Sequence, residues 1–108
     1  MPDLAATINN LGILQRDLGH FNEAEESYRE ALDICRALAD KNPEAYLPSV
    51  ATALNNLGDL QRALGHFNEA EESYQEALET YRALADKNPE AYLPNVATAL
   101  NKIGRAHV

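Results

Sequence analysis

The chain has 108 residues and a net charge of −8, with 9 basic against 17 acidic side chains. It is long enough for one small domain and too short for two. No apolar run reaches the roughly 18–20 residues of a membrane span, and no N-terminal stretch is typical of a signal peptide. The acidic balance argues against nucleic acid as a partner, because phosphate binding needs clustered Lys and Arg. We therefore expect a cytoplasmic protein without membrane or nucleic-acid partners.

An internal repeat of 46 residues organises the sequence. Residues 2–47 and 48–93 align without a gap and differ at 11 positions, which leaves 35 of the 46 identical. Residues 94–108 begin a third copy, of which 15 residues are present. Self-similarity at a fixed period of this length is typical of solenoids, so each copy is expected to be one structural repeat.

The first copy predicts two helices, over about residues 3–18 and 22–40, because its apolar positions advance by three or four residues. The second copy predicts the same pair at about 49–64 and 68–86, and the third copy contributes one more first helix. Short helices with one apolar stripe are marginal in water, so we expect them to pair within a copy and to stack between copies. The sequence thus predicts an all-α, right-handed α-solenoid of antiparallel helical hairpins with about five helices.

Residues with known positional preferences mark the ends of these helices. Pro48 is expected in the first turn of its helix, where a missing N–H costs nothing. Gly65 is expected to end that helix in a left-handed conformation. Asn68 is expected to cap the next helix, with Glu71 completing a capping box. The segment 43–47 is therefore predicted to be a connector between copies.

Apolar, aromatic and small residues recur at fixed places in each copy, in the second copy at Leu54, Leu57, Gly58, Gly65, Phe67, Ala70, Tyr74 and Ala77. In order and spacing they resemble the tetratricopeptide repeat signature. Their period of 46 exceeds the usual period of about 34, and the phrase Pro-x-Val-Ala-Thr-Ala-Leu-Asn-Asn-Leu-Gly is similar to the long-repeat subclass of kinesin light chains and bacterial signalling arrays. The resemblance implies a protein–protein interaction scaffold whose first helices line a concave groove.

No set of residues predicts catalysis, a metal site or a cofactor. Cys35 is the only cysteine, which excludes an intramolecular disulfide and a cysteine-based zinc cluster. Because Cys35 lies in an apolar stripe, it is interpreted as a small buried hydrophobe and not as a nucleophile. His20 and His66 occupy equivalent turns without further metal ligands at suitable spacing. We therefore expect neither an enzyme nor a bound cofactor.

A peptide-binding groove is the function that this pattern favours. Asn9, Asn55 and Asn101 recur once per copy, and a carboxamide offers two donors and an acceptor to an extended backbone. The resemblance points the same way, since that subclass uses groove asparagines on bound peptide. This arrangement assumes that Ile8, Leu11 and Leu18 pack inward. The predicted groove residues are Asn9, Asn55, Asn101, Ile13, Asp59, Arg16 and Arg62, with Asn10 and Asn56 as secondary candidates.

Three alternatives stay open. The asparagines could instead hydrogen-bond within the stack, which would equally explain two adjacent poor helix formers in one helix. Arg16 and Arg62 could pair with a ligand carboxylate or with Asp17 and Asp59. The whole stretch could also be an architectural spacer or self-assembly segment of a larger signalling protein, since the ends of a short stack expose apolar surface.

The partner is expected to be a protein or peptide of neutral or basic character, because the net charge is negative. The final six residues, 103–108, resemble the translated read-through of a sequencing adapter. We therefore expect a truncated reading frame of a longer array and leave these residues out of the functional argument.

Overall fold

The structure is a computed structural model that describes the backbone of residues 2–106 and the side chains of residues 4–105. This part of the chain forms five α-helices and no strand. The prediction of an all-α solenoid of helical hairpins is therefore confirmed. The helices are α1 (Pro2–Asp17), α2 (Phe21–Lys41), α3 (Pro43–Ala63), α4 (Phe67–Lys87) and α5 (Pro89–Ala106).

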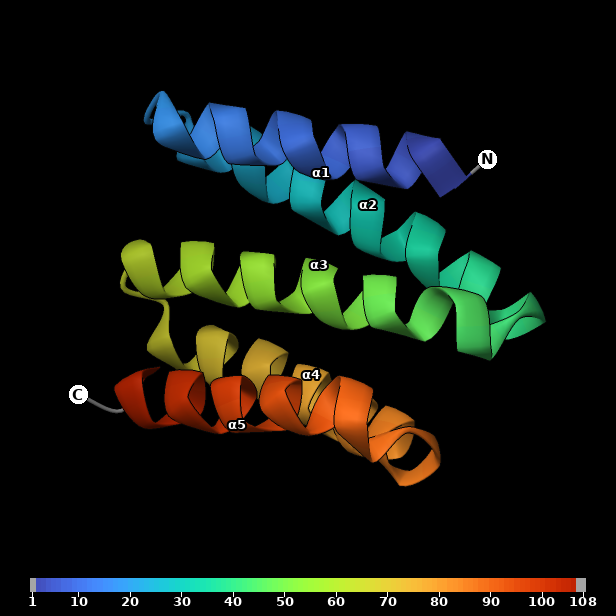
Figure 1. Cartoon of the computed structure of the whole chain (residues 1–108). Helices are drawn as coiled ribbons and strands as arrows, with labels where there is room; N and C mark the ends of the chain where they lie inside the picture. The colour runs from blue at the N-terminus through green and yellow to red at the C-terminus, as the bar shows by residue number, and fades with distance from the viewer. Residues whose placement is uncertain (1, 107–108) are drawn as a thin grey trace.

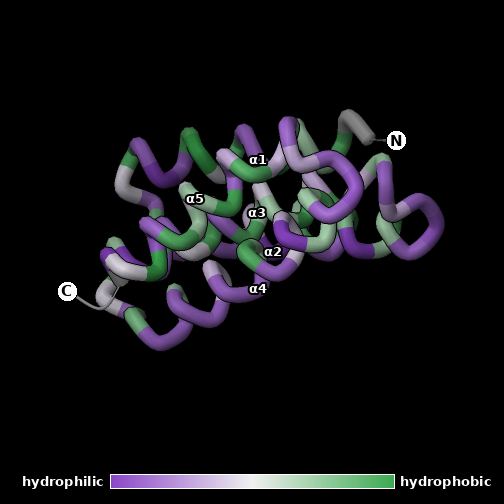
Figure 2. The backbone as a smooth tube through the Cα atoms, turned by 60° about the horizontal axis from the view of Figure 1, so that its bottom comes forward, coloured by the Kyte–Doolittle hydropathy of each residue, from purple (hydrophilic) through white to green (hydrophobic). Residues whose placement is uncertain are grey.

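The helices form two layers. The first helix of each hairpin, α1, α3 and α5, lies towards the viewer in Figure 1, and α2 and α4 lie behind. The shortest dimension of the molecule is 18 Å, which matches two helices of about 10 Å diameter. Every helix carries both hydrophobic and hydrophilic residues, as expected for helices that bury one face (Figure 2). Over the described residues, none of them is long and apolar enough to cross a membrane.

Two of the first helices begin earlier than the sequence predicted. α3 begins at Pro43 instead of near residue 49, so the expected connector 43–47 is helical and Pro48 lies inside the helix. Proline in the second turn forfeits one backbone hydrogen bond. The half-buried side chains of Tyr46 and Leu47 pack against the core, and this contact favours the helical conformation over a loop.

The turn within each hairpin contains a left-handed glycine. Gly19 and Gly65 both have a φ of +82°, which confirms the conformation predicted for Gly65. His66 occupies the N-cap position of α4 without a side-chain cap bond, and the helix begins at Phe67. The prediction that Asn68 caps this helix is therefore wrong, because the tight turn brings the chain into the helix two residues earlier.

The core lies between the two layers. Tyr28 and Tyr74 are fully buried. A Cβ at Gly58 would lie 2.6 Å from Cε1 of Tyr74, so the ring requires glycine at the facing position of α3. Four alanines of α2 and α4 are also buried, and their small side chains allow close approach of neighbouring helices: Ala24, Ala31, Ala70 and Ala77.

The outer face of α1 remains exposed, contrary to the inward packing assumed for it. Leu11 is 47% exposed and Leu18 is 62% exposed. Leu57, which occupies the register of Leu11 one copy later, is 3% exposed. The reason is that α2 packs against this side of α3, whereas no described helix packs against the same side of α1.

Candidate functional site

The predicted groove residues lie on α1, α3 and α5, and most of their side chains are half-buried. The three asparagines that recur once per copy differ in exposure, since Asn101 is exposed and Asn9 and Asn55 are half-buried. Asn10 is exposed as well. The half-buried members are Asn9, Ile13 and Arg16 on α1 and Asn55, Asn56, Asp59 and Arg62 on α3.

A hydrogen bond between two carboxamides joins α1 to α3. The Nδ2 of Asn56 donates to the Oδ1 of Asn9 at 3.0 Å. This contact shows that the asparagines do hydrogen-bond within the stack at this position. The Nδ2 of Asn9 has no partner among the described residues, so this carboxamide still offers its two donors.

An ion pair joins α3 to α5. The Nζ of Lys102 lies 3.0 and 2.9 Å from the two carboxylate oxygens of Asp59. The hydroxyl of Tyr74 donates to the same carboxylate at 2.6 Å, and Lys102 lies 5.8 Å from the centre of the Tyr74 ring. The sequence reasoning missed Lys102 and Tyr74 as partners of Asp59. The available signal was that lysine replaces the asparagine expected at position 102.

The environment of Tyr74 changes its acidity. Burial raises the pKa of Tyr74 above the usual value near 10, and the hydrogen bond to Asp59 raises it further. Tyr28 is the equivalent residue of the first hairpin, and Ile13 stands there in place of Asp59. The Tyr28 hydroxyl is consequently buried without a partner in the described structure, and burial raises the pKa of this phenol as well.

The exchange at position 102 also leaves Asn55 in a different environment from Asn9. Lys102 occupies the register of Asn56 and turns to Asp59. The Oδ1 of Asn55 is buried and has no partner in the part of the chain that the structure describes. The α1–α3 and α3–α5 interfaces therefore use different polar contacts.

A third polar contact is the same in both hairpins. The hydroxyl of Ser27 donates to Oε1 of Gln15 at 2.6 Å, and that of Ser73 donates to Oε1 of Gln61 at 2.7 Å. These bonds join the two helices of each hairpin. They give the glutamines at positions 15 and 61 a structural role.

The two arginines of the predicted groove are differently placed. Arg16 lies 3.4 Å from the neighbouring Asp17 at the surface. Arg62 is half-buried and forms no ion pair within the described residues. A single guanidinium on α3 is thus available to an acidic group or a carbonyl of a ligand.

The cysteine and histidine side chains, which in other proteins often act in catalysis or metal binding, lie apart from one another here. Cys35 is buried as predicted, and burial raises the pKa of its thiol, which keeps the thiol protonated. His20 lies 3.3 Å from Glu23 at the surface. Within the described part of the chain, no three His, Cys, Asp or Glu residues gather as metal ligands.

Comparison with known proteins identifies the family. Two family models match, both described as tetratricopeptide repeat, one over residues 4–44 and the other over residues 35–83. Among curated proteins, none matches this chain. Tetratricopeptide repeats form non-catalytic scaffolds that generally mediate protein–protein interactions. The chain belongs to the tetratricopeptide repeat family.

Proposed function

We propose that this protein binds an extended peptide segment or a partner helix across the face formed by α1, α3 and α5. Support comes from the family, whose members generally bind proteins, and from the side-by-side arrangement of these three helices (Figure 1). In such a scaffold, residues 2–47 and 48–93 would be two repeats and residues 94–108 the start of a third. It assigns no catalytic step and no cofactor to the chain.

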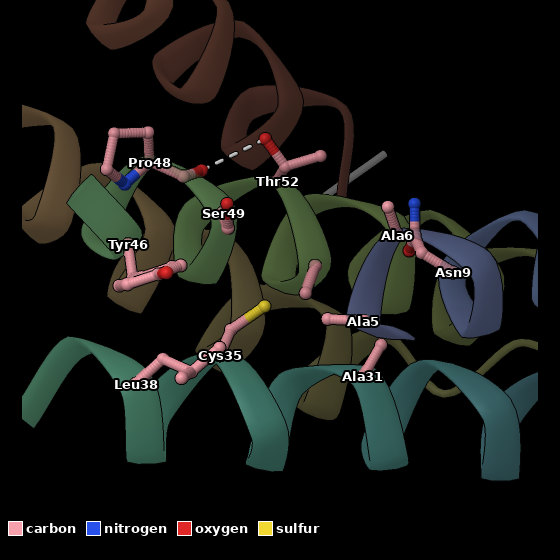
Figure 3. A pocket seen from close by; sticks show the side chains of 11 residues that line it. Ala5, Ala6, Asn9, Ala31, Cys35, Leu38, Tyr46, Pro48, Ser49 and Thr52 are labelled. Atoms are coloured by element: carbon pink, nitrogen blue, oxygen red, sulfur yellow. Dashed lines mark hydrogen bonds between the residues drawn. The ribbon is translucent and has the colours of Figure 1, made fainter. Parts of the chain in front are cut away.

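The observation that carries this proposal is the orientation of Asn9. Its Oδ1 is held by Asn56 across the stack, while its Nδ2 remains unpaired in the described structure. The Asn9 nitrogen points away from α2 (Figure 3). A carboxamide held in this way presents its donors without a further loss of side-chain entropy, which favours binding to a peptide carbonyl. Tethering and ligand binding are therefore compatible roles for this residue.

The charges of the protein indicate which kind of peptide segment it would bind. The net charge of −8 favours encounter with neutral or basic partners. Arg62 lies on the same helix as Asn55 and Asn56 and has no acidic partner among the described residues. We expect the Arg62 guanidinium to donate hydrogen bonds to a peptide carbonyl or to the C-terminal carboxylate of the bound segment.

The test distinguishes two roles of the Asn9 carboxamide, which are donating hydrogen bonds to a ligand and accepting one from Asn56. Asn9→Asp keeps an acceptor for Asn56 and removes both donors. Peptides are first selected on the wild-type chain from a randomised dodecapeptide library displayed on phage, and their affinities are measured by fluorescence polarisation. We expect Asn9→Asp to weaken binding about tenfold or more, which corresponds to one lost hydrogen bond in a shielded site, with thermal stability nearly unchanged.

Asn10→Asp is the matched control, because it adds the same charge to the exposed neighbouring residue. Equal affinity of the two variants for the selected peptides would contradict the role of Asn9. A library that yields no binder to the wild-type chain would contradict the proposed function itself.

Self-assembly is a second candidate, and the exposed face of α1 favours it. Leu4, Leu11 and Leu14 are about half exposed on this helix, and Leu93 and Leu100 are about half exposed on α5. Exposed apolar faces at the ends of a stack favour end-to-end association of identical units. Light scattering over a hundredfold range of concentration tests this, with Leu11→Glu as the interface variant. A mass that stays monomeric throughout would contradict self-assembly.

A further inference from the structure

A cavity of about 250 Å³ lies between the first hairpin, formed by α1 and α2, and the following helix α3 (Figure 3). Cys35 and Leu38 of α2 form its floor, and the thiol of Cys35 points into it. Ala5 of α1 and Tyr46 and Ala53 of α3 form its walls. Because these side chains are small or largely apolar, this part of the cavity is hydrophobic. The polar groups of the cavity belong to the remaining lining residues.

The second hairpin shows what fills the same position. One period of 46 residues later, four of these five residues are unchanged in type, and Cys35 is replaced by Tyr81. Among the other lining residues, Ala6 and Ser49 are replaced by Thr52 and Asn95. The Tyr81 side chain is 5% exposed. It packs in one cluster with the equivalents of the other four, which are Ala51, Leu84, Tyr92 and Ala99. The phenol ring that fills this site in the second hairpin is therefore missing from the first.

We propose that the cavity of the first hairpin binds one small monocyclic aromatic molecule of phenol size. Its walls are those that enclose a phenol ring in the second hairpin, so their shape already suits such a ring. An apolar cavity of about 150 Å³ is sufficient to hold benzene in a protein core. The present cavity is larger and leaves room for one polar substituent.

Two polar side chains that line the cavity are available to a hydroxyl of the ligand. Asn9 and Ser49 also line the cavity, and both carry groups that can hydrogen-bond to a phenol. The Thr52 hydroxyl is already engaged, since it donates to the carbonyl of Pro48 at 3.0 Å (Figure 3). Binding is non-covalent, because the ligand needs no reaction with the protonated thiol of Cys35. This site adjoins the proposed peptide-binding face and shares Asn9 with it, whereas Ser49, Cys35 and Leu38 belong to the cavity alone.

The experiment titrates 4-methylphenol, the side chain of tyrosine, into the full chain and follows the amide signals by NMR. A dissociation constant on the order of 0.1–1 mM is expected for a ligand of this size, with shifts concentrated around the cavity. Cys35→Tyr should abolish binding, or weaken it about tenfold or more, and raise the melting temperature by filling the cavity. Cys35→Ala should retain binding, since the thiol is only part of the lining.

The second hairpin offers the matched control. Tyr81→Cys should open an equivalent cavity and add a second site, with new shifts around Ala51 and Ala99. Cys35→Phe provides an independent filled variant, and circular dichroism verifies that each variant folds. Absence of binding to the wild-type chain would overturn the proposal, and so would equal binding by wild type and a folded Cys35→Tyr or Cys35→Phe variant.

Discussion

The carboxamide of Asn56 donates to the carboxamide of Asn9 and so links the first helices of two successive hairpins at 3.0 Å. One period later the register of Asn56 is occupied by Lys102, which pairs with Asp59 instead. Equivalent interfaces of successive first helices are thus joined by a neutral pair in one case and by an ion pair in the other. The differences between copies, more than their common signature, give this stack its individual properties.

Removing the amide pair should lower stability by a small and measurable amount. Asn56→Ala removes the donor to Asn9, and we expect a loss of about 0.5–1.5 kcal/mol in the free energy of unfolding relative to the control. Asn10→Ala is that control, because it lies at the same register in the first copy, is exposed and gains the same helix propensity. Urea unfolding measures both. Equal changes in the two variants would show that the amide pair contributes nothing.

The two buried tyrosines should respond oppositely to loss of their hydroxyls. Tyr28→Phe removes a buried hydroxyl that has no described partner, so stability should stay the same or increase. Tyr74→Phe removes a hydrogen bond to the charged Asp59, which should cost about 1.5–3 kcal/mol. Thermal unfolding of both variants at neutral pH tests the contrast. A larger loss for Tyr28→Phe than for Tyr74→Phe would contradict the assigned contacts.

Stability should fall in alkaline solution. The pKa values of Tyr28 and Tyr74 are raised in the folded chain, chiefly by burial, whereas unfolded tyrosine ionises near pH 10. Below pH 10 both states are protonated and the full stability is present. Above pH 10 the unfolded chain loses these protons first, so stability declines as the pH rises towards the folded values.

Urea unfolding at pH 8, 10 and 11 measures this decline. The double variant Tyr28→Phe with Tyr74→Phe is the control, and its decline should be shallower because both groups are removed. Identical slopes for the wild-type chain and the double variant would assign the alkaline loss to other groups.

Glycines of the first helices should differ sharply in their tolerance of alanine. A Cβ at Gly58 would lie 2.6 Å from the buried ring of Tyr74, and we expect Gly58→Ala to cost about 1–3 kcal/mol through overpacking. Gly104 occupies the same register of α5 and has no neighbour within 4 Å of its added Cβ. Gly104→Ala should therefore gain up to about 1 kcal/mol from helix propensity. Similar losses for both variants would contradict the close packing at Tyr74.

Much of the hairpin could be predicted from the sequence because its determinants are local. Apolar spacing predicts the helices, and Gly65 predicts the turn, since a left-handed residue is needed where the helix ends. The start of α3 could not be predicted in this way. Pro48 is typical of a helix start, yet packing of Tyr46 and Leu47 on the core extends the helix back to Pro43.

For the candidate site, too, the sequence predicted which helices carry the residues but not the contacts between them. Spacing placed Asn9 and Asn56 on first helices, but the bond between them spans 47 residues and the Lys102–Asp59 pair spans 43, neither of which is the period of 46. Which residues pair depends on how far neighbouring first helices are shifted relative to one another along their axes. Side-chain packing between the two layers sets that shift.

The sequence by itself determined the repeat, the helices and the register of each residue within its copy, because backbone hydrogen bonds in a helix join residues close in the chain. Only the tertiary structure decided that Leu11 is exposed while Leu57 is buried, and that Cys35 leaves a cavity where Tyr81 fills one. Burial is a property of what lies against a residue, and equivalent residues of a short stack have different neighbours.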